Sequence, residues 1–244
     1  MESNECTKDR EQPAQKESST QQQAKTYLAF PKSNQTSLAI LILPDIIGCE
    51  SINIQLLADD FAARGYFVAV PDLFAGDALD YDDFRSGKVD LPTWLLKHTT
   101  ADVDPIVDNV LTQLRQRYGV ERIGAVGYCF GAKYAIRLLS ANLISAGAGA
   151  HPSFVEEDEL GAIRKPLLIS AAETDHVFPA EKRHQSEEIL RGLGVPYHVS
   201  LYSGVAHGFA VRADLSVRRA RFAKEAAFSE QVRWFGEYVG KPPK

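Results

Sequence analysis

Short apolar runs alternate with segments of helical periodicity along most of the chain. Residues 36–44 (TSLAILILP) form an apolar run of strand length, and residues 66–74 (YFVAVPDLF) form another that is rich in β-branched and aromatic side chains. Between them, residues 52–65 repeat their apolar positions with the spacing of a helix and end at a glycine. This order predicts a strand, a helix and a second strand.

The same alternation returns further along the chain. We expect helices at 101–119, 132–142, 179–194 and about 214–239, and strands at 121–128, 143–151, 165–173 and 196–203. Strands that are apolar throughout and are separated by helices favour a parallel sheet covered on both faces. The pattern therefore predicts an α/β fold: one domain with a mostly parallel central sheet flanked by helices.

Two segments depart from the alternation. Residues 1–25 are rich in Gln, Lys, Glu and Ser, which predicts a disordered polar tail ahead of a folded domain at 26–244. Residues 75–98 are acidic and aromatic and contain a proline, and we expect a lid-like insertion there. Its side chains Phe84, Trp94, Leu95 and Leu96 either roof an active site or pack the insertion onto the domain.

Composition narrows the class of protein. The chain is 45% hydrophobic and 24% charged with a net charge of -5, which is typical of a soluble globular protein. No apolar run reaches the roughly 18 residues of a membrane span, and the N-terminus lacks the apolar core of a signal peptide, so we expect a cytoplasmic protein without membrane contact. The absence of a dense Lys/Arg block argues against nucleic-acid binding.

The three cysteines, Cys6, Cys49 and Cys129, fit neither a disulfide framework nor a CxxC metal site, so we expect free thiols and no metal. Only Cys129 stands between glycines, in Gly127-x-Cys129-x-Gly131, after an expected strand and before an expected helix. This is the context of a nucleophile elbow. A helix N-terminus favours thiolate over thiol, and its amides can hold an oxyanion.

A nucleophile in this position requires an acid and then a histidine, each after a later strand. Asp175 follows the strand expected at 165–173, and His207 follows the one at 196–203. His151 ends the strand at 143–151, where it either lines the pocket or is a structural histidine. The remaining histidines are expected on the surface or in packing, with His176 a minor competitor for the triad: His98, His176, His184 and His198.

At these motifs the sequence resembles the dienelactone hydrolase family, and its fungal members in particular. The resemblance rests on GYCFGAKYA at 127–135, AAETDHVFP at 171–179 and GVAHGFAVR at 204–212, supported by LPDIIG at 43–48 and RGYFVAVPDLF at 64–74, and it extends from about residue 26 to 240. It implies an α/β-hydrolase fold with a Cys-His-Asp triad. It also implies that the triad opens small lactones or cleaves activated esters through an acyl-enzyme, without a cofactor.

In that chemistry the amides of Ile46 and Phe130 are expected to hold the oxyanion. Two positions depart from the bacterial relatives, which have a glutamate near the resting cysteine where this chain has Asp45, and a substrate-binding arginine four residues after the triad histidine, whereas Arg212 lies five after His207. Asp45 either activates the thiol or caps the following turn. Further candidate substrate contacts are Arg85, Trp94, Tyr128, His151, Phe209 and Arg212.

Two other functions stay open. The fold and triad could serve a non-hydrolytic step on a biosynthetic intermediate, such as an isomerisation, a retro-aldol cleavage or a cyclisation. The chain could also be a non-catalytic protein that binds a small hydrophobic molecule, although all three triad members are present. We expect a monomer, or a homodimer paired through the exposed face of the C-terminal helix.

Overall fold

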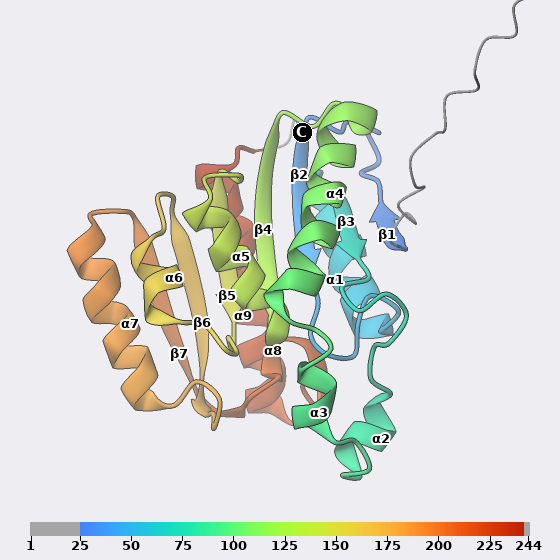
Figure 1. The fold of residues 1–244 in the computed structure, drawn as a ribbon. Coiled ribbons are helices and arrows are strands. Elements are labelled where there is room, and N and C mark those ends of the chain that lie inside the picture. Colours follow the sequence, from blue (N-terminus) through green and yellow to red (C-terminus); the bar gives the residue numbers. More distant parts are fainter. Residues whose placement is uncertain (1–24, 242–244) are drawn as a thin grey trace, which may run out of the picture.

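The computed structural model describes residues 25–241, so the predicted tail lies almost entirely outside the described residues. Its centre is a seven-stranded sheet with the order β1-β3-β2-β4-β5-β6-β7, and helices cover both faces (Figure 1). Six strands run parallel: β2 (Leu38–Leu43), β3 (Phe67–Pro71), β4 (Arg122–Tyr128), β5 (Ala146–Ala150), β6 (Leu167–Thr174) and β7 (Tyr197–Ala206). The predicted α/β architecture is confirmed.

One strand escaped the sequence analysis. β1 (Thr26–Ala29) pairs antiparallel with β3 at the edge of the sheet, with Thr26 opposite Pro71 and Ala29 opposite Val68. Four residues are too few to show the period-2 pattern of a strand, and the pairing depends on contacts with a segment about 40 residues away. The long-range partner, not the local sequence, decides this element.

The helices form two layers, one on each face of the sheet (Figure 1). One layer contains α4 (Thr100–Tyr118), α5 (Phe130–Ser140), α6 (Glu157–Gly161) and α7 (Ala180–Leu193). The other contains α1 (Ile52–Ala63), α8 (Phe209–Arg212) and α9 (Arg218–Tyr238). Each layer packs on the side chains that alternate toward it from the strands.

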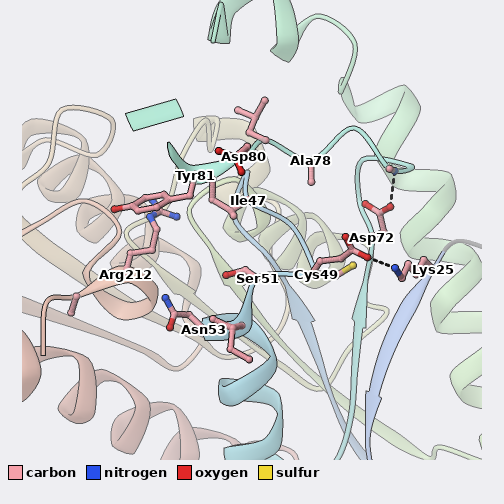
Figure 2. Close-up of a pocket in the computed structure, with 15 residues that line it drawn as sticks. Lys25, Ile47, Cys49, Ser51, Asn53, Asp72, Ala78, Asp80, Tyr81 and Arg212 are labelled. Atoms are coloured by element: carbon pink, nitrogen blue, oxygen red, sulfur yellow. Dashed lines mark hydrogen bonds and ion pairs between the residues drawn. The ribbon is translucent and has the colours of Figure 1, made fainter. Parts of the chain in front are cut away.

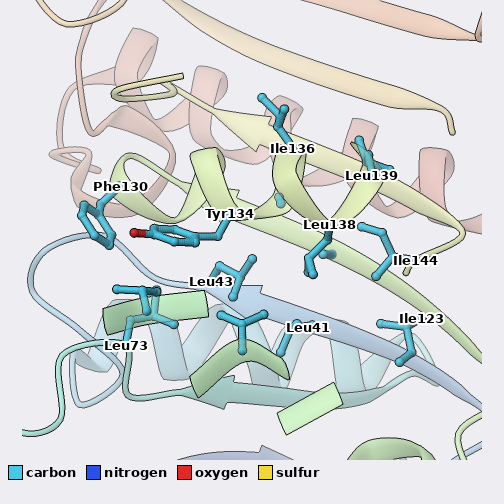
Figure 3. Close-up of a cluster of buried hydrophobic side chains, with 14 of the residues drawn as sticks. Leu41, Leu43, Leu73, Ile123, Phe130, Tyr134, Ile136, Leu138, Leu139 and Ile144 are labelled. Carbon is cyan, nitrogen blue, oxygen red and sulfur yellow. The ribbon is translucent and has the colours of Figure 1, made fainter. Parts of the chain in front are cut away.

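Strand β2 shows how that alternation makes two hydrophobic clusters. Leu41 and Leu43 pack with Tyr134 and Leu138 of α5, as Figure 3 shows, whereas Ile40 and Ile42 belong to the opposite cluster with residues of α1 and α9. All of the β2 residues from 39 to 43 have no exposed surface. Burial on both faces explains why this strand reads as a continuous apolar run and not as an alternating one.

The segment 75–98, where we expected a lid-like insertion, has secondary structure of its own. It contains two short helices, α2 (Tyr81–Arg85) and α3 (Leu91–Leu95), which begin after Asp80 and Asp90, and each aspartate accepts hydrogen bonds from backbone amides of its helix. Trp94 is only 6% exposed and packs against Phe74, while its indole N–H donates to the carbonyl of Asp77 at 2.8 Å. The role of segment 75–98 as a lid stays a prediction.

Candidate active site

Cys129 lies on a strained turn between β4 and α5. Its φ of 52° and ψ of −114° fall in a region that side chains with a Cβ rarely occupy. The backbone around it is held on both sides, because the Cys129 amide donates to the carbonyl of Ala150 at 3.1 Å and its own carbonyl accepts from Ala132 at 3.1 Å. This conformation is that of the nucleophile elbow expected from the sequence.

The two glycines of the motif are required because a side chain at either position would overlap the neighbouring backbone. A Cβ on Gly127 would lie 2.3 Å from the carbonyl oxygen of Gly131, and a Cβ on Gly131 would lie 2.0 Å from the carbonyl oxygen of Leu43. Neither distance is possible for real carbon and oxygen atoms, and both neighbours are backbone that cannot move aside. Glycines at these positions let the start of α5 approach β2 and β4 closely enough to form the turn.

Asp175 and His207 meet at the same edge of the sheet. The Asp175 Oδ2 atom lies 2.8 Å from Nδ1 of His207, and its Oδ1 accepts hydrogen bonds from the amides of Val177 at 2.8 Å and Phe178 at 2.9 Å. Burial alone would raise the pKa of this carboxyl, but the hydrogen bonds from His207 and the two amides outweigh it and lower the pKa. Asp175 is therefore held as an oriented carboxylate.

The same contacts set the charge of His207. Burial by itself would lower the pKa of the imidazole, but hydrogen bonding to Asp175 and to Cys129 raises it to about 10. At neutral pH the ring is therefore protonated, between a carboxylate on its Nδ1 side and the sulfur of Cys129. The structure brings the three expected triad members together.

His151 lies directly beside this triad. Its ring is fully buried and meets the His207 ring edge-on with centroids 4.9 Å apart, and neither of its nitrogens has a hydrogen-bond partner among residues 25–241. Burial, followed by the repulsion of His207, lowers the pKa of His151 well below the ordinary value. It is a neutral packing partner of the triad histidine.

Ser153, two residues further on, was missed in the sequence analysis. Its Oγ atom lies 3.3 Å from Sγ of Cys129, its amide donates to the carbonyl of Cys129 at 3.1 Å, and the residue is 1% exposed. The sequence offered one signal for it, since it follows the end of β5, the strand next to the elbow strand. A serine after a strand end is nevertheless too common to single out.

The two backbone amides expected to form an oxyanion hole flank Cys129. Phe130 is the first residue of α5, and Ile46 follows the end of β2, the neighbour of β4 in the sheet. In the described part of the chain neither amide N–H donates to a backbone carbonyl or a side chain. The Phe130 amide is free because it lies at the N-terminus of α5, and the Ile46 amide is free in the turn that follows β2.

Of the two roles expected for Asp45, the structure shows the cap of the following turn, and it adds an ion pair that was not expected. Its Oδ1 accepts from the amide of Ile47 at 3.1 Å, which caps the turn, and its Oδ2 forms an ion pair with Nη1 of Arg212. Asp45 has no exposed surface, and burial lowers the pKa of Arg212. The guanidinium also lies 5.8 Å from the centre of the Tyr81 ring of α2.

A cavity of about 680 Å³ lies on the outer side of this ion pair, and Figure 2 shows its wall. Arg212 and Tyr81 face it from one side, and Ile47 and Asp80 line it nearby. None of the three triad residues lines the cavity, so Arg212 is the side chain that joins the cavity to the buried Asp45 beside the elbow.

The remaining candidate substrate contacts lie away from the cavity wall. Tyr128 is fully buried and its hydroxyl donates to Oε1 of Gln231 at 2.9 Å, which ties β4 to α9, and Phe209 packs against His151 at 5.6 Å between ring centroids. Trp94 packs into the core, and Arg85 lies exposed on α2 outside the cavity. His98 is buried and contacts Asp77, whereas the other three histidines are exposed: His176, His184 and His198.

Two kinds of feature are absent from residues 25–241: a metal-binding cluster and a membrane-spanning helix. No group of three or more His, Cys, Asp or Glu side chains there is placed to hold a metal ion. No helix in that part of the chain is both long enough and apolar enough to cross a membrane.

Fungal proteins resemble the chain over most of its length. The protein named hydrolase pyvD of Aspergillus violaceofuscus is 49% identical over 215 residues, which are 88% of this chain and 87% of that protein. Hydrolase tropI of Talaromyces stipitatus is 46% identical, covering 87% and 86% of the two chains. Dienlactone hydrolase 1 of Gibberella moniliformis is 32% identical, covering 88% and 85%.

Solved structures share the fold at lower identity. The dienelactone hydrolase of Anabaena variabilis superposes with a TM-score of 0.65 at 14% identity, covering 88% of this chain and 91% of that one. A thermophilic esterase of Thermogutta terrifontis gives a TM-score of 0.68 at 16% identity, covering 90% and 91%. The sequence model of the dienelactone hydrolase family matches residues 24–239. With this match and fungal relatives at 49% and 46% identity, the chain belongs to the dienelactone hydrolase family and is a carboxylic ester or lactone hydrolase.

Proposed function

We propose that the protein opens a small lactone, or cleaves an activated ester, through a Cys129-His207-Asp175 triad and an acyl-enzyme. The observation that carries the proposal is the 2.8 Å contact between Nδ1 of His207 and Oδ2 of an Asp175 whose other oxygen is fixed by two amides. This arrangement orients the imidazole and leaves its Nε2 for the sulfur on the elbow. The imidazolium of His207 then lies beside the sulfur that attacks.

In acylation the Cys129 thiolate attacks the carbonyl carbon and the carbonyl electron pair moves onto oxygen. The amides of Ile46 and Phe130 stabilise that oxyanion. As the tetrahedral intermediate collapses, the carbon–oxygen bond of the ester breaks and the imidazolium of His207 gives its proton to the leaving oxygen. The product is a thioester on Cys129, and for a lactone the new hydroxyl or enol stays attached to the acyl group.

In deacylation water attacks the thioester while neutral His207 takes a proton from it. The second tetrahedral intermediate expels the sulfur, and the carboxylic acid leaves. Throughout both steps Asp175 stabilises the charged form of the ring, which matches a His207 pKa of about 10. No metal or organic cofactor takes part in this scheme.

A sulfur nucleophile restricts the substrate. A tetrahedral intermediate that carries both a thiolate and an ordinary alkoxide tends to expel the thiolate, which reverses the attack. Enol lactones and aryl esters have leaving groups that compete with sulfur, so they suit Cys129 better than alkyl esters do. The Arg212 guanidinium on the cavity wall further supports a substrate that bears a carboxylate.

Intact-mass spectrometry after brief exposure to an activated ester or an enol lactone, quenched in acid, tests the proposal. We expect a transient acyl adduct in the wild type and none in Cys129→Ala, with turnover lost in the variant. Cys49→Ala is the matched control, because Cys49 is also buried but burial raises its pKa to about 11, and this variant should keep both the adduct and turnover.

Full turnover by Cys129→Ala would refute the triad chemistry. Absence of both product and adduct with every ester and lactone tried would favour a non-hydrolytic reaction on a biosynthetic intermediate. Covalent labelling that is the same in the wild type and in Cys129→Ala would favour the binding protein.

A further inference from the structure

Ser153 contacts the proposed nucleophile with both its backbone and its side chain. The amide donates to the Cys129 carbonyl at 3.1 Å, and the hydroxyl oxygen lies 3.3 Å from the Cys129 sulfur. The backbone contact fixes the position of Ser153 next to Cys129, and burial restricts the rotation of its side chain. With 1% of its surface exposed, Ser153 cannot turn that hydroxyl toward solvent.

The direction of the hydrogen bond follows from the atoms available. Among the described residues the Ser153 hydroxyl has the Cys129 sulfur as its partner and no other. A thiolate has no proton and can only accept, so beside a thiolate the hydroxyl must be the donor. Hydrogen bonds to a charged group are about twice as strong as those between neutral groups, and this one is shielded from water.

We propose that Ser153 is a further catalytic residue, whose hydroxyl donates a hydrogen bond to the Cys129 sulfur whenever that sulfur carries negative charge. The inference rests on the proposed function of Cys129. In the proposed mechanism the sulfur is negative when it attacks as a thiolate and again in deacylation. In that step water has added to the thioester carbonyl and given a proton to His207, the carbon–sulfur bond then breaks, and its electron pair moves onto sulfur. The Ser153 proton stays on its oxygen throughout.

This role differs from that of an ordinary buried serine in what it predicts. A hydroxyl that only fills space or fixes the loop changes stability when it is removed, but leaves the protonation of the sulfur unchanged. A hydroxyl that donates to the thiolate changes the pH at which the sulfur becomes reactive, and it changes the lifetime of the thioester.

Alkylation of Cys129 by iodoacetamide between pH 4 and 10, followed peptide by peptide with mass spectrometry, reads the first effect without any substrate. In Ser153→Ala we expect the midpoint of the pH profile to rise by about one unit, so that on its rising limb the variant reacts about tenfold more slowly. Cys49 is read in the same samples and should keep its profile.

Ser170→Ala is the matched control. Ser170 of β6 is also a fully buried serine, and its hydroxyl has no hydrogen-bond partner within residues 25–241. This variant loses the same atoms from the neighbouring strand, and it should leave the Cys129 profile where it is in the wild type. Ser153→Thr keeps the hydroxyl and should restore the midpoint.

The second readout is the lifetime of the acyl adduct, which should be several-fold longer in Ser153→Ala than in the wild type or Ser170→Ala. If the alanine variant does not fold, Ser153→Thr and Ser153→Val make the same comparison, since they share a shape and differ in the hydroxyl. An unchanged alkylation midpoint on loss of the hydroxyl overturns the inference about Ser153. Failure of the triad itself would show separately, as full turnover by Cys129→Ala.

Discussion

At the scale of single residues, two neighbouring histidines have opposite pKa shifts: His151 is buried and His207 is partly buried. His207 has a carboxylate partner and a pKa of about 10, whereas His151 has no hydrogen-bond partner in the described chain and a pKa well below the ordinary value. Their ring centroids are 4.9 Å apart, so two positive charges would repel strongly there. A neutral His151 therefore allows His207 to stay charged.

The pH dependence of Asp175→Asn follows from this arrangement. The raised pKa of His207 means that the general acid of the proposed mechanism persists in the wild type up to about pH 10, so the alkaline decline in kcat/KM should lie near that pH. An amide at position 175 no longer stabilises the imidazolium. We expect the alkaline limb to move toward lower pH and kcat/KM at pH 7.5 to fall roughly 10²- to 10⁴-fold.

The same substitution has a stability counterpart. A histidine whose pKa is raised on folding stabilises the fold fully below its unfolded pKa of about 6.5, and that stability is lost as the pH rises to the folded value. Denaturant unfolding at pH 6, 8 and 10 should therefore show the wild type losing stability relative to Asp175→Asn across this range. Parallel curves for the two proteins would contradict the pKa of about 10.

The sequence predicts Cys129, Asp175 and His207 as the triad because each follows a predicted strand, and the structure places the three residues after β4, β6 and β7. Ser153 could not be located in this way. Its position depends on the backbone turn at His151, where φ is 38°, and on a hydrogen bond to a residue 24 positions earlier. Neither leaves a pattern in the local sequence.

At the scale of elements, the short helix α8 decides where Arg212 points. It begins at Phe209, directly after Gly208, and places Arg212 one turn further on, with its amide bonded to the Gly208 carbonyl at 2.8 Å. A Cβ on Gly208 would lie 2.8 Å from Nη2 of Arg212, so the glycine leaves room for the guanidinium to turn back toward Asp45.

We predict that the Arg212–Asp45 pair contributes to substrate choice as well as to stability. Arg212→Gln alone leaves a fully buried carboxylate unpaired, and it should destabilise the fold by about 3–5 kcal/mol. The double variant Asp45→Asn/Arg212→Gln removes both charges and should recover most of that loss. Denaturant unfolding of the wild type, the single and the double variant measures both changes.

The double variant then tests substrate choice without the stability defect. Matched p-nitrophenyl esters, one with a terminal carboxylate and one without, give the preference as a ratio of kcat/KM values. We expect the wild type to prefer the acid, and the double variant to lose about tenfold or more of that preference. An unchanged ratio would show that Arg212 serves the fold and not the substrate.

Elements were predictable from the sequence in proportion to their length. The long helices α4 and α9 and the buried strands repeat their apolar spacing often enough to be recognised, whereas β1, α6 and α8 have five residues or fewer. The starts of α2 and α3 are marked in the sequence, since Asp80 and Asp90 are N-cap residues and Pro92 lies in the first turn of α3. Trp94 shows the limit, because its burial depends on Phe74 and Phe130.

At the scale of the whole molecule, every part of the site comes from one edge of one sheet. The proposed nucleophile, acid and histidine follow β4, β6 and β7, and the amides proposed for the oxyanion hole follow β2 and β4. The family model begins at residue 24. We therefore predict a functional unit that does not require the polar residues 1–24.

A truncation series tests that unit. A variant that starts at residue 25 should keep the kcat/KM of the full chain and change the unfolding temperature by less than about 2 °C.

A variant that starts at residue 30 also lacks β1, which pairs with β3 along four residues and carries the buried Ala29. It should unfold several degrees lower, because the edge of β3 loses its hydrogen bonds and its cover. Thermal unfolding and ester hydrolysis of the three proteins make the comparison. A loss of stability or activity already at the first cut would place the boundary of the folded domain within residues 1–24.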